Sequence, residues 1–520
     1  MEVLDQLIKK TIQFSNDIAF SGDHYEAGEL VYSAAELIEE IDFEKSLELY
    51  SHNINIWEKL INTLVLQGLF HEIAEIHLRI SELYGEKFQN YKLEKKHIFK
   101  CINVLKEETK LLKEFNEYRK LSQNYQHIAE LYLKLQKFKG AIKYYKKVIE
   151  IAEPQRYLDL LSYSYQRVSS CYEELDDYKS SKDIILDGIT YFSELFHKFE
   201  EKNDNLAVAQ ISQILKKLYD IIGDSDQFLK YTKKEAGAYI NLAESIKKSK
   251  NNYQKISRYY RGAALCYKEL EDNLLESASC FVLAGNYSEK IERFNDAGIN
   301  FIDAAYIFKQ LNNMEQTYKN FIRSGDAFWK IGEMSKSTEA YLNAYDTAIE
   351  GNLEFNRFGI FNQLVRGLSK IAEEGLKNKQ FYTAAKLILE SIKFYEQLDS
   401  AKDFFLREML KNLYKYYYRA ADLKRIGYGH IVQSYILAAL SSILIGKLDK
   451  AQDIMDEIES ETLTVKDYIK LINIIIQKIK KHEKINIEEF PYSITRLVEN
   501  SEDISYLLSL FDRKLVKSES

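Results

Sequence analysis

A short motif of one aromatic residue, two variable residues and one alanine occurs three times between Tyr253 and Ile349. The copies begin at Tyr260, Phe301 and Tyr341, which are 41 and then 40 positions apart. A large and a small residue repeated together are typical of helices that pack closely, because the small residue admits a neighbour and the aromatic ring fills the groove. A period of about 40 residues therefore predicts a stacked array of helix hairpins.

A second comparison within the chain supports the same period. The segment from Cys280 to Tyr306 aligns without a gap to the segment 40 positions later, with the identical pairs Phe281/Phe321, Gly285/Gly325, Lys290/Lys330, Ile291/Ile331 and Ala304/Ala344. We expect glycine and alanine to lie where two helices approach closely and the aromatic rings to fill the space between them. The predicted repeat-packing residues are Tyr260, Ala263, Gly285, Phe301, Ala304, Gly325, Tyr341 and Ala344.

The composition favours helices throughout the 520 residues. Only 2 prolines and 20 glycines occur, so the residues that most often break helices and make tight turns are scarce. Asp, Asn, Lys and the few glycines must then form the loops. The 39 tyrosines and 27 phenylalanines supply bulk for the grooves between helices.

Charge and cysteine usage exclude several classes of protein. A formal net charge of −7 and a pI near 5.9 argue against a nucleic-acid binder, which must neutralise phosphates. The four cysteines, Cys101, Cys171, Cys266 and Cys280, form no CxxC pair and are predicted to be buried free thiols in a reducing compartment. The sequence has no signal-peptide pattern and no apolar run long enough for a membrane span, so we expect a cytoplasmic protein.

The repeat resembles the tetratricopeptide repeat (TPR) most clearly from Tyr125 onward. The matching positions are Tyr125, Ile128, Ala129 and Tyr132 on a first helix and Phe138, Ala141, Tyr145 and Val148 on a second. The resemblance implies an all-α fold: a right-handed solenoid of antiparallel TPR-like hairpins closed by a C-terminal helical cap or bundle. We divide the chain into N-terminal hairpins (1–110), a repeat array (111–458) and C-terminal capping helices (459–520).

The chain contains no recognisable catalytic, metal or cofactor motif. His71-Glu72 begins a zinc-protease pattern, but the next histidine, His77, is on a different face of the helix, so no metal site is predicted. Gly427-Tyr428-Gly429 lacks the third glycine of a dinucleotide-binding loop. We predict neither an enzyme nor a cofactor. The basic run of Lys143, Lys146 and Lys147 is either a solvated face or a surface for a partner.

Two regions resemble the soluble NSF attachment proteins (SNAPs). The segment from Leu274 to Lys290 is similar to a family helix rich in Ala, Cys and Phe that leads into an Ala-Gly-Asn triplet, here Ala284, Gly285 and Asn286. A hairpin with Ala438, Ala439, Leu448 and Ala451 and the stretch from Asp503 to Leu508 resemble the family's C-terminal part. The chain is longer than a typical SNAP, and Val516–Ser520 does not reproduce the family's acidic C-terminal segment with a leucine.

The resemblance to SNAPs implies an adaptor with specific partners. It implies binding of a SNARE-type helical bundle along one face and recruitment of an AAA ATPase through the C-terminal end, near Leu507, Leu508, Leu510 and Phe511. Phe14 and Phe20, which we place in a loop at residues 14–22, would correspond to a loop that contacts the membrane, so the protein would be peripheral to membranes. The sequence leaves the oligomeric state open.

Two hypotheses of function follow. The first is a non-enzymatic, SNAP-like adaptor in membrane fusion or vesicle trafficking. The alternative is a generic TPR scaffold that binds a peptide or helix in signalling or chaperone assembly.

Overall fold

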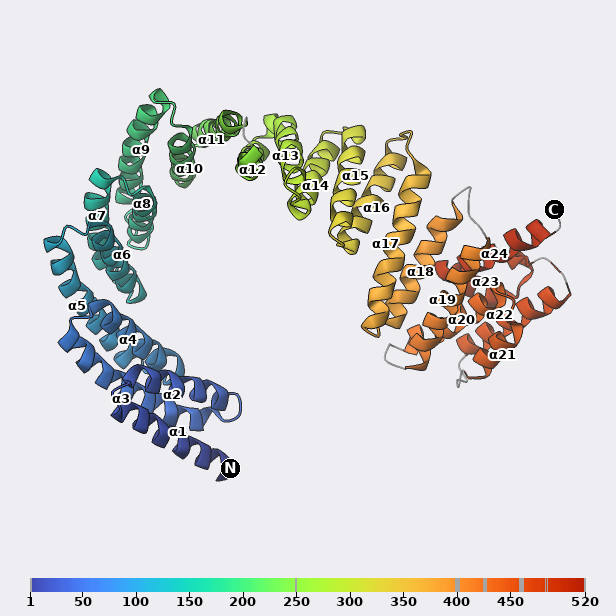
Figure 1. Cartoon of the computed structure of the whole chain (residues 1–520), viewed down its shortest axis with the longest axis horizontal. Helices are drawn as coiled ribbons and strands as arrows, with labels where there is room; N and C mark the ends of the chain where they lie inside the picture. The colour runs from blue at the N-terminus through green and yellow to red at the C-terminus, as the bar shows by residue number, and fades with distance from the viewer. Residues whose placement is uncertain are drawn as a thin grey trace. The chain divides into compact units, whose positions relative to one another are not determined.

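The chain folds almost entirely into helices. The computed structural model describes residues 2–247, 250–397, 403–423, 428–457, 463–481, 483 and 485–518, and no strand occurs among them. These residues form two compact units, Met1–Glu235 and Ala236–Ser520 (Figure 1). The division into 1–110, 111–458 and 459–520 follows the regularity of the repeat instead and stays a prediction. Its boundary at 458/459 lies outside the described residues.

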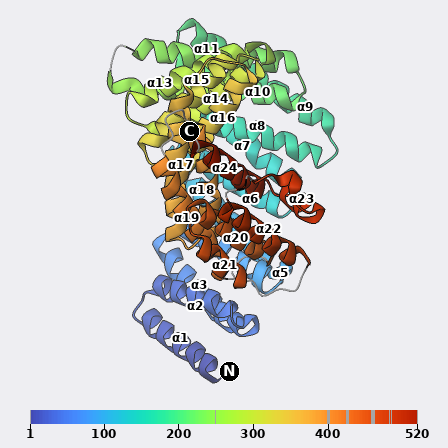
Figure 2. The same ribbon diagram turned by 90° about the vertical axis from the view of Figure 1, so that its right-hand side faces the viewer.

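The first unit is a stack of helices in which each helix packs against the next one along the chain. Figures 1 and 2 both show α1, α2 and α3 side by side at the beginning of this stack. Its helices are α1 (Glu2–Phe20), α2 (His24–Glu39), α3 (Phe43–Gln67), α4 (Phe70–Glu82), α5 (Tyr91–Glu114), α6 (Tyr118–Lys134), α7 (Phe138–Gln155), α8 (Leu158–Glu173), α9 (Tyr178–Glu201) and α10 (Asn205–Ile221). α11 (Ser225–Ile246) begins in this unit and ends in the second.

The second unit begins with the regular hairpins that the sequence motif marks. They are α12 (Tyr253–Lys268), α13 (Leu274–Glu289), α14 (Phe294–Gln310), α15 (Met314–Lys330) and α16 (Met334–Glu350). Buried serine hydroxyls donate to carbonyl oxygens on adjacent helices, for example Ser257 to Ala284 at 2.9 Å and Ser324 to Gly298 at 3.0 Å. These bonds are short enough only because small residues let the helices approach closely.

The rest of the second unit packs around one apolar helix, α20, whose residues from Ile436 to Leu440 are fully buried. Its core includes residues of every helix from α17 to α24. These helices are α17 (Arg357–Lys377), α18 (Phe381–Glu396), α19 (Asp403–Asp422), α20 (Tyr428–Leu444), α21 (Leu448–Asp456), α22 (Leu463–Lys480), α23 (Tyr492–Glu499) and α24 (Glu502–Ser518). The predicted all-α, TPR-like helical solenoid with a C-terminal bundle is confirmed.

The loops of the arrays have a regular chemistry although glycine and proline are scarce. Four successive helices are each followed, at intervals of 20 residues, by a residue in the left-handed region with a φ of 56° or 57°. These residues are Asn116, Gln136, Arg156 and Asp176. The next residue closes the turn, as where the Lys137 N–H donates to the Tyr132 carbonyl at 2.8 Å. Asp177 then accepts a hydrogen bond from the Ser180 N–H at 3.1 Å and caps the following helix.

Two sequence predictions have clear outcomes here. All four cysteines are buried free thiols, as predicted, and burial raises the pKa of Cys101 to about 12. The predicted loop at residues 14–22 is wrong, because α1 continues to Phe20 and only Ser21 and Gly22 form the turn. Ile18 and Ala19 pack against the core of the first unit. Ser15 is buried within the helix, where its hydroxyl donates to the Ile12 carbonyl at 2.9 Å and bonds the His52 ring at 3.0 Å.

Candidate functional site

The first unit has two cavities on the side where α6, α8 and α10 lie. Figure 1 shows these three helices on one side of the stack and α7 and α9 on the other. The first cavity, of about 680 Å³, lies between α5, α6 and α8 and is also lined by His71 of α4. The second, of about 620 Å³, lies between α8 and α10. We call this side, with its two cavities, the inner groove.

One face of α6 provides most of the polar lining of the first cavity. Lys120, Gln123, Asn124 and His127 follow one another at steps of three, one and three residues, a spacing that places them on one side of a helix. The opposite side of α6 is apolar, with Leu121, Tyr125, Ile128 and Ala129 buried. Burial of this apolar stripe therefore turns the amide and imidazole groups toward the cavity.

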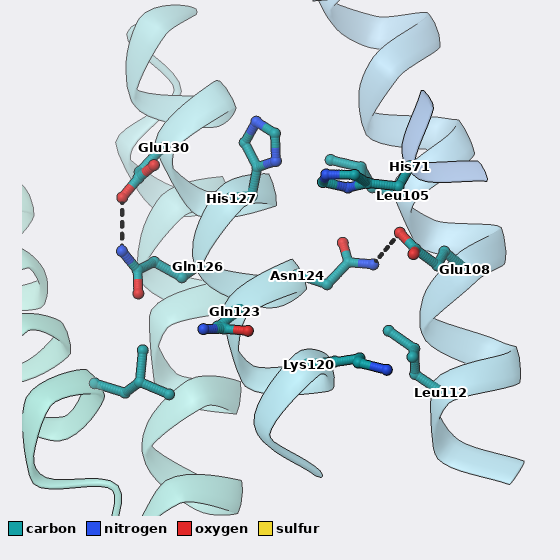
Figure 3. A pocket seen from close by; sticks show the side chains of 11 residues that line it. His71, Leu105, Glu108, Leu112, Lys120, Gln123, Asn124, Gln126, His127 and Glu130 are labelled. Atoms are coloured by element: carbon teal, nitrogen blue, oxygen red, sulfur yellow. Dashed lines mark hydrogen bonds between the residues drawn. The ribbon is translucent and has the colours of Figure 1, made fainter. Parts of the chain in front are cut away.

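Asn124 is the most buried polar residue in this lining. Its side chain is 7% exposed, and its Nδ2 donates to Glu108 Oε2 at 2.7 Å (Figure 3). Its Oδ1 has no hydrogen-bond partner among the described residues. A buried carbonyl oxygen without a partner is costly, so this atom is ready to accept a hydrogen bond from a ligand or a water molecule.

Burial also shifts the pKa values of two groups that line the cavity. It raises the pKa of Glu108, although the hydrogen bond from Asn124 and the nearby His71 and Lys120 act in the opposite direction. Burial lowers the pKa of His127, so that its imidazole is neutral at pH 7. The cavity is thus lined mainly by groups that form hydrogen bonds, together with Lys120 and the carboxyl groups of Glu108 and Glu130.

A chain of hydrogen bonds connects the two cavities. Glu130 Oε1 accepts from Gln126 at 2.9 Å and from the Tyr163 hydroxyl of α8 at 3.2 Å, and Gln126 and Glu130 are joined in Figure 3. Tyr163 also lines the second cavity, where Gln166 makes a separate bond within α8, to the Ser162 carbonyl at 3.0 Å. That cavity also receives the amides Gln210 and Gln213 from α10. Amide side chains therefore occur on all three helices of the inner groove.

Amide side chains suit one kind of ligand in particular. Each carries a donor and an acceptor, as a peptide backbone does, so it can pair with the N–H and C=O groups of an extended segment. The described residues contain no group of three or more His, Cys, Asp or Glu side chains arranged to hold a metal ion. Sequence reasoning missed the inner groove, although the polar spacing of Lys120, Gln123, Asn124 and His127 opposite the tyrosine stripe could have indicated it.

The residues predicted to contact a membrane are exposed. Phe14 is 59% exposed within α1, and Phe20 is 96% exposed at its end. Because α1 ends at Phe20, both residues lie on this helix rather than in the predicted loop. Among the described residues no helix is both long and apolar enough to cross a membrane.

The residues predicted near an ATPase-binding end lie in the core of the second unit. Leu507, Leu508, Leu510 and Phe511 are at most 5% exposed and pack in the cluster around α20. Their spacing in α24 places them on the side that the bundle covers. In this fold their side chains stabilise the bundle and are not available to a partner.

Two of the three lysines of the predicted basic face contact different tyrosines. Lys146 Nζ donates to the Tyr172 hydroxyl at 3.0 Å. Lys147 Nζ instead lies 5.0 Å from the ring centroid of Tyr125 and 4.8 Å from that of Tyr144. Lys143 is exposed between these two directions.

The predicted packing residues lie inside the second unit. Tyr260, Ala263, Phe301, Ala304, Tyr341 and Ala344 are at most 2% exposed. Gly285 faces the Phe301 ring and Gly325 faces the Tyr341 ring, with no space for a further carbon atom at either position. Gly427, in the Gly-Tyr-Gly segment that we excluded as a nucleotide site, and residues 519–520 of the C-terminal segment lie outside the described residues.

Comparison with known proteins supports a relation to TPR repeat proteins. No family model matches the chain. A TPR repeat-containing protein of Methanocaldococcus jannaschii is 23% identical over 317 residues, which are 58% of this chain and 48% of that protein. The chain thus spans about half the length of this curated relative.

Two solved structures illustrate how limited the structural likeness is. A signal transduction ATPase with numerous domains (STAND) protein with a tetratricopeptide repeat sensor, from Pyrococcus horikoshii, is 16% identical, with 86% of this chain and 56% of that chain covered and a TM-score of 0.28. A human IFIT1 dimer with PPP-AAAA is 14% identical, with 79% and 89% covered and a TM-score of 0.22. Such scores carry no inference about ligands or partners.

Proposed function

We propose that this protein is a TPR-like scaffold that binds a segment of a partner protein in the inner groove of its first unit. The observation that carries this proposal is the set of amide side chains along α6, α8 and α10, namely Gln123, Asn124, Gln126, Gln166, Gln210 and Gln213. The similarity to a TPR repeat-containing protein supports the same class of function. A non-enzymatic role and protein partners are part of this proposal, and a cytoplasmic location stays a prediction.

The chemistry of the groove favours an extended peptide segment. The backbone of such a segment exposes N–H and C=O groups that the amides can pair with, and Asn124 Oδ1 offers an acceptor that none of the described residues uses. Lys120 in the first cavity and Lys217 in the second can attract acidic side chains, while Glu108 and Glu130 can attract basic ones. The groove is therefore suited to a polar segment of mixed charge.

The proposal is tested by selecting peptides from a random 12-residue phage library on the full-length protein and measuring their affinity by calorimetry. We expect the triple variant Gln126→Ala, Gln166→Ala and Gln213→Ala to bind the selected peptides at least about tenfold more weakly, through the loss of several hydrogen bonds. The matched control changes Lys179, Lys182 and Lys198 of α9 to alanine and should bind like the wild type. Selected peptides that bind the groove variant with unchanged affinity would place the binding surface elsewhere.

The SNAP-like adaptor function is a narrower form of the same proposal. It is supported by the resemblance around Ala284, Gly285 and Asn286, whereas the sequence similarity found is to a TPR repeat-containing protein. The generic scaffold therefore fits the findings better. A pull-down with ATP hydrolysis blocked distinguishes the two, since a SNAP-like adaptor should recover an AAA ATPase together with coiled-coil membrane proteins.

A further inference from the structure

Four lysines gather around three tyrosine rings on α5, α6 and α7. Lys106 Nζ lies 3.2 Å from the Tyr132 hydroxyl, and Lys113 Nζ lies 5.8 Å from the centroid of the Tyr125 ring. Lys147 lies over the rings of Tyr125 and Tyr144. We call Lys106, Lys113, Lys143 and Lys147, with Tyr125, Tyr132 and Tyr144, the Lys–Tyr face.

The lysines of this face form no ion pair with the described residues. Among the described residues, none of the four lysines has a carboxylate oxygen within 4.0 Å of its Nζ, whereas Lys110 on the same helix pairs with Glu107 at 2.6 Å. Burial lowers the pKa of Lys147, and the nearby charges of Lys143 and Lys113 add to this effect, whereas Glu150 acts in the opposite direction. The lysines thus repel one another, and an anionic partner would relieve that repulsion.

The same framework recurs one repeat later with three of its four charges reversed. Lys106, Tyr125 and Tyr132 correspond, 40 positions further on, to Lys146, Tyr165 and Tyr172, and Lys146 repeats the bond to the tyrosine hydroxyl. The other three lysines are replaced by acids, with the pairs Lys113/Glu153, Lys143/Asp183 and Lys147/Asp187. A basic surface is therefore followed by an acidic surface built on the same backbone.

The acidic surface is hollow. A cavity of about 540 Å³ between α7 and α9 has an excess of negative charge, because its lining holds four carboxyl groups and one lysine. The lining residues are Glu150, Glu153, Asp187, Glu194 and Lys146, with Ile149, Ile184, Tyr165, Thr190 and Tyr191. Glu153 is held in place by a hydrogen bond from the Tyr165 hydroxyl. We call this the acidic cavity. Lys147 lies over the rings of the Lys–Tyr face, and the acidic cavity lies between α7 and α9, so the two surfaces share α7. Figure 1 shows α7 between α5 and α9.

We propose that two copies of this chain associate through a two-fold axis near α7, so that the Lys–Tyr face of each copy contacts the acidic cavity of the other. A two-fold axis that lies in the plane of contact, perpendicular to the helix stack, makes the stacks of the two copies run in opposite directions. The Lys–Tyr face of each copy then lies opposite the acidic cavity of the other, so the same pairing occurs twice in one interface. The partner is a second copy of this chain because the chain itself carries both the basic and the acidic surface. The two surfaces are adjacent, as a two-fold symmetric interface requires. The inner groove lies on the other side of the stack and stays free.

The first test is the mass of the full-length protein in solution, measured by sedimentation velocity over a range of concentrations. At low ionic strength we expect a species of twice 61.0 kDa, and added salt should favour the monomer because it screens surface charges. The variant Lys113→Glu with Lys143→Glu should dimerise at least about tenfold more weakly, since like charges would then face each other. The matched control, Lys120→Glu with Lys217→Glu in the inner groove, has the same net charge and should still dimerise.

The second test combines two variants that should each be monomeric. Asp187→Lys with Glu194→Lys makes both surfaces basic, whereas the triple variant Lys113→Glu, Lys143→Glu and Lys147→Glu makes both acidic. A mixture of the two should form a heterodimer, which only folded proteins with complementary surfaces can do. A wild-type protein that stays monomeric at all concentrations and salt levels, or variants that dimerise as the wild type does, would overturn the proposal. Loss of dimerisation without loss of peptide binding would leave the proposed function intact.

Discussion

The contact between Gly285 and Phe301 makes a strong prediction about the repeat. A Cβ atom added at Gly285 would lie 2.7 Å from Phe301 Cζ and 2.8 Å from Cδ1, whereas carbon atoms in unstrained contact are about 3.5–4.0 Å apart. The ring would have to move by about 1 Å. It is fully buried, and the Arg323 guanidinium lies 3.8 Å from its centroid on one face. Arg323 is itself held by Glu289 at 2.7 Å, so the ring has little room to move.

We therefore expect Gly285→Val to lower the free energy of unfolding by about 1–3 kcal/mol through overpacking. In a thermal melt followed by circular dichroism this corresponds to a midpoint about 2–6 °C lower. The control is Gly237→Ala in α11, where an added Cβ meets no atom within 4 Å and the gain in helix propensity should raise stability by about 0.5–1 kcal/mol. Replacing Phe301 by the smaller leucine in the Gly285→Val variant should restore part of the loss. A Gly285→Val melt that coincides with that of the wild type would refute the close packing.

Two further perturbations test other parts of the fold. Burial lowers the pKa values of His77 and His97 to about 4, below the ordinary value of 6.5, so the unfolded chain binds protons that the folded chain does not. The contribution of each histidine to the free energy of unfolding should be fully present above pH 6.5 and should fall by about 1.4 kcal/mol per pH unit as the pH drops toward 4. In urea unfolding at several pH values, the free energy of unfolding should therefore depend less steeply on pH in His77→Leu than in the wild type. Gln136 adopts a left-handed φ of 56°, so Gln136→Gly should raise the free energy of unfolding by about 1 kcal/mol, whereas the same change at Gln126, inside α6, should lower it.

The repeat could be predicted from the sequence because its signals are local. Tyr341 and Ala344 mark a buried face whichever helices surround them, and the 40-residue interval between Phe301 and Tyr341 holds only if the hairpins stack regularly. The same local reasoning failed at α1. Asn16 and Asp17 favour a turn by themselves, but Ile18 and Ala19 pack against the core of the first unit and keep the chain helical.

The candidate site could not be predicted in the same way, because it depends on contacts between distant residues. Asn124 is unusual because its Nδ2 donates to Glu108 while its Oδ1 has no partner in the described part of the chain, and these two residues are on different helices. The charge of the Lys–Tyr face likewise becomes visible only when α5 is placed beside α7. A sequence pattern shows which side of a helix is polar, but only the packed structure shows which polar groups have no partner.

The regular interval between the left-handed turns has a consequence for how such a chain can change in length. Asn116, Gln136, Arg156 and Asp176 recur every 20 residues, and each interval holds one helix and its turn. Duplication or loss of one interval would exchange the inner and outer sides for every helix that follows. Duplication of two intervals would preserve those sides and add one more hairpin with its own surface charges. The array is therefore free to grow by pairs of helices, and the reversal of charge between neighbouring hairpins is a change that such copies can acquire without disturbing the backbone.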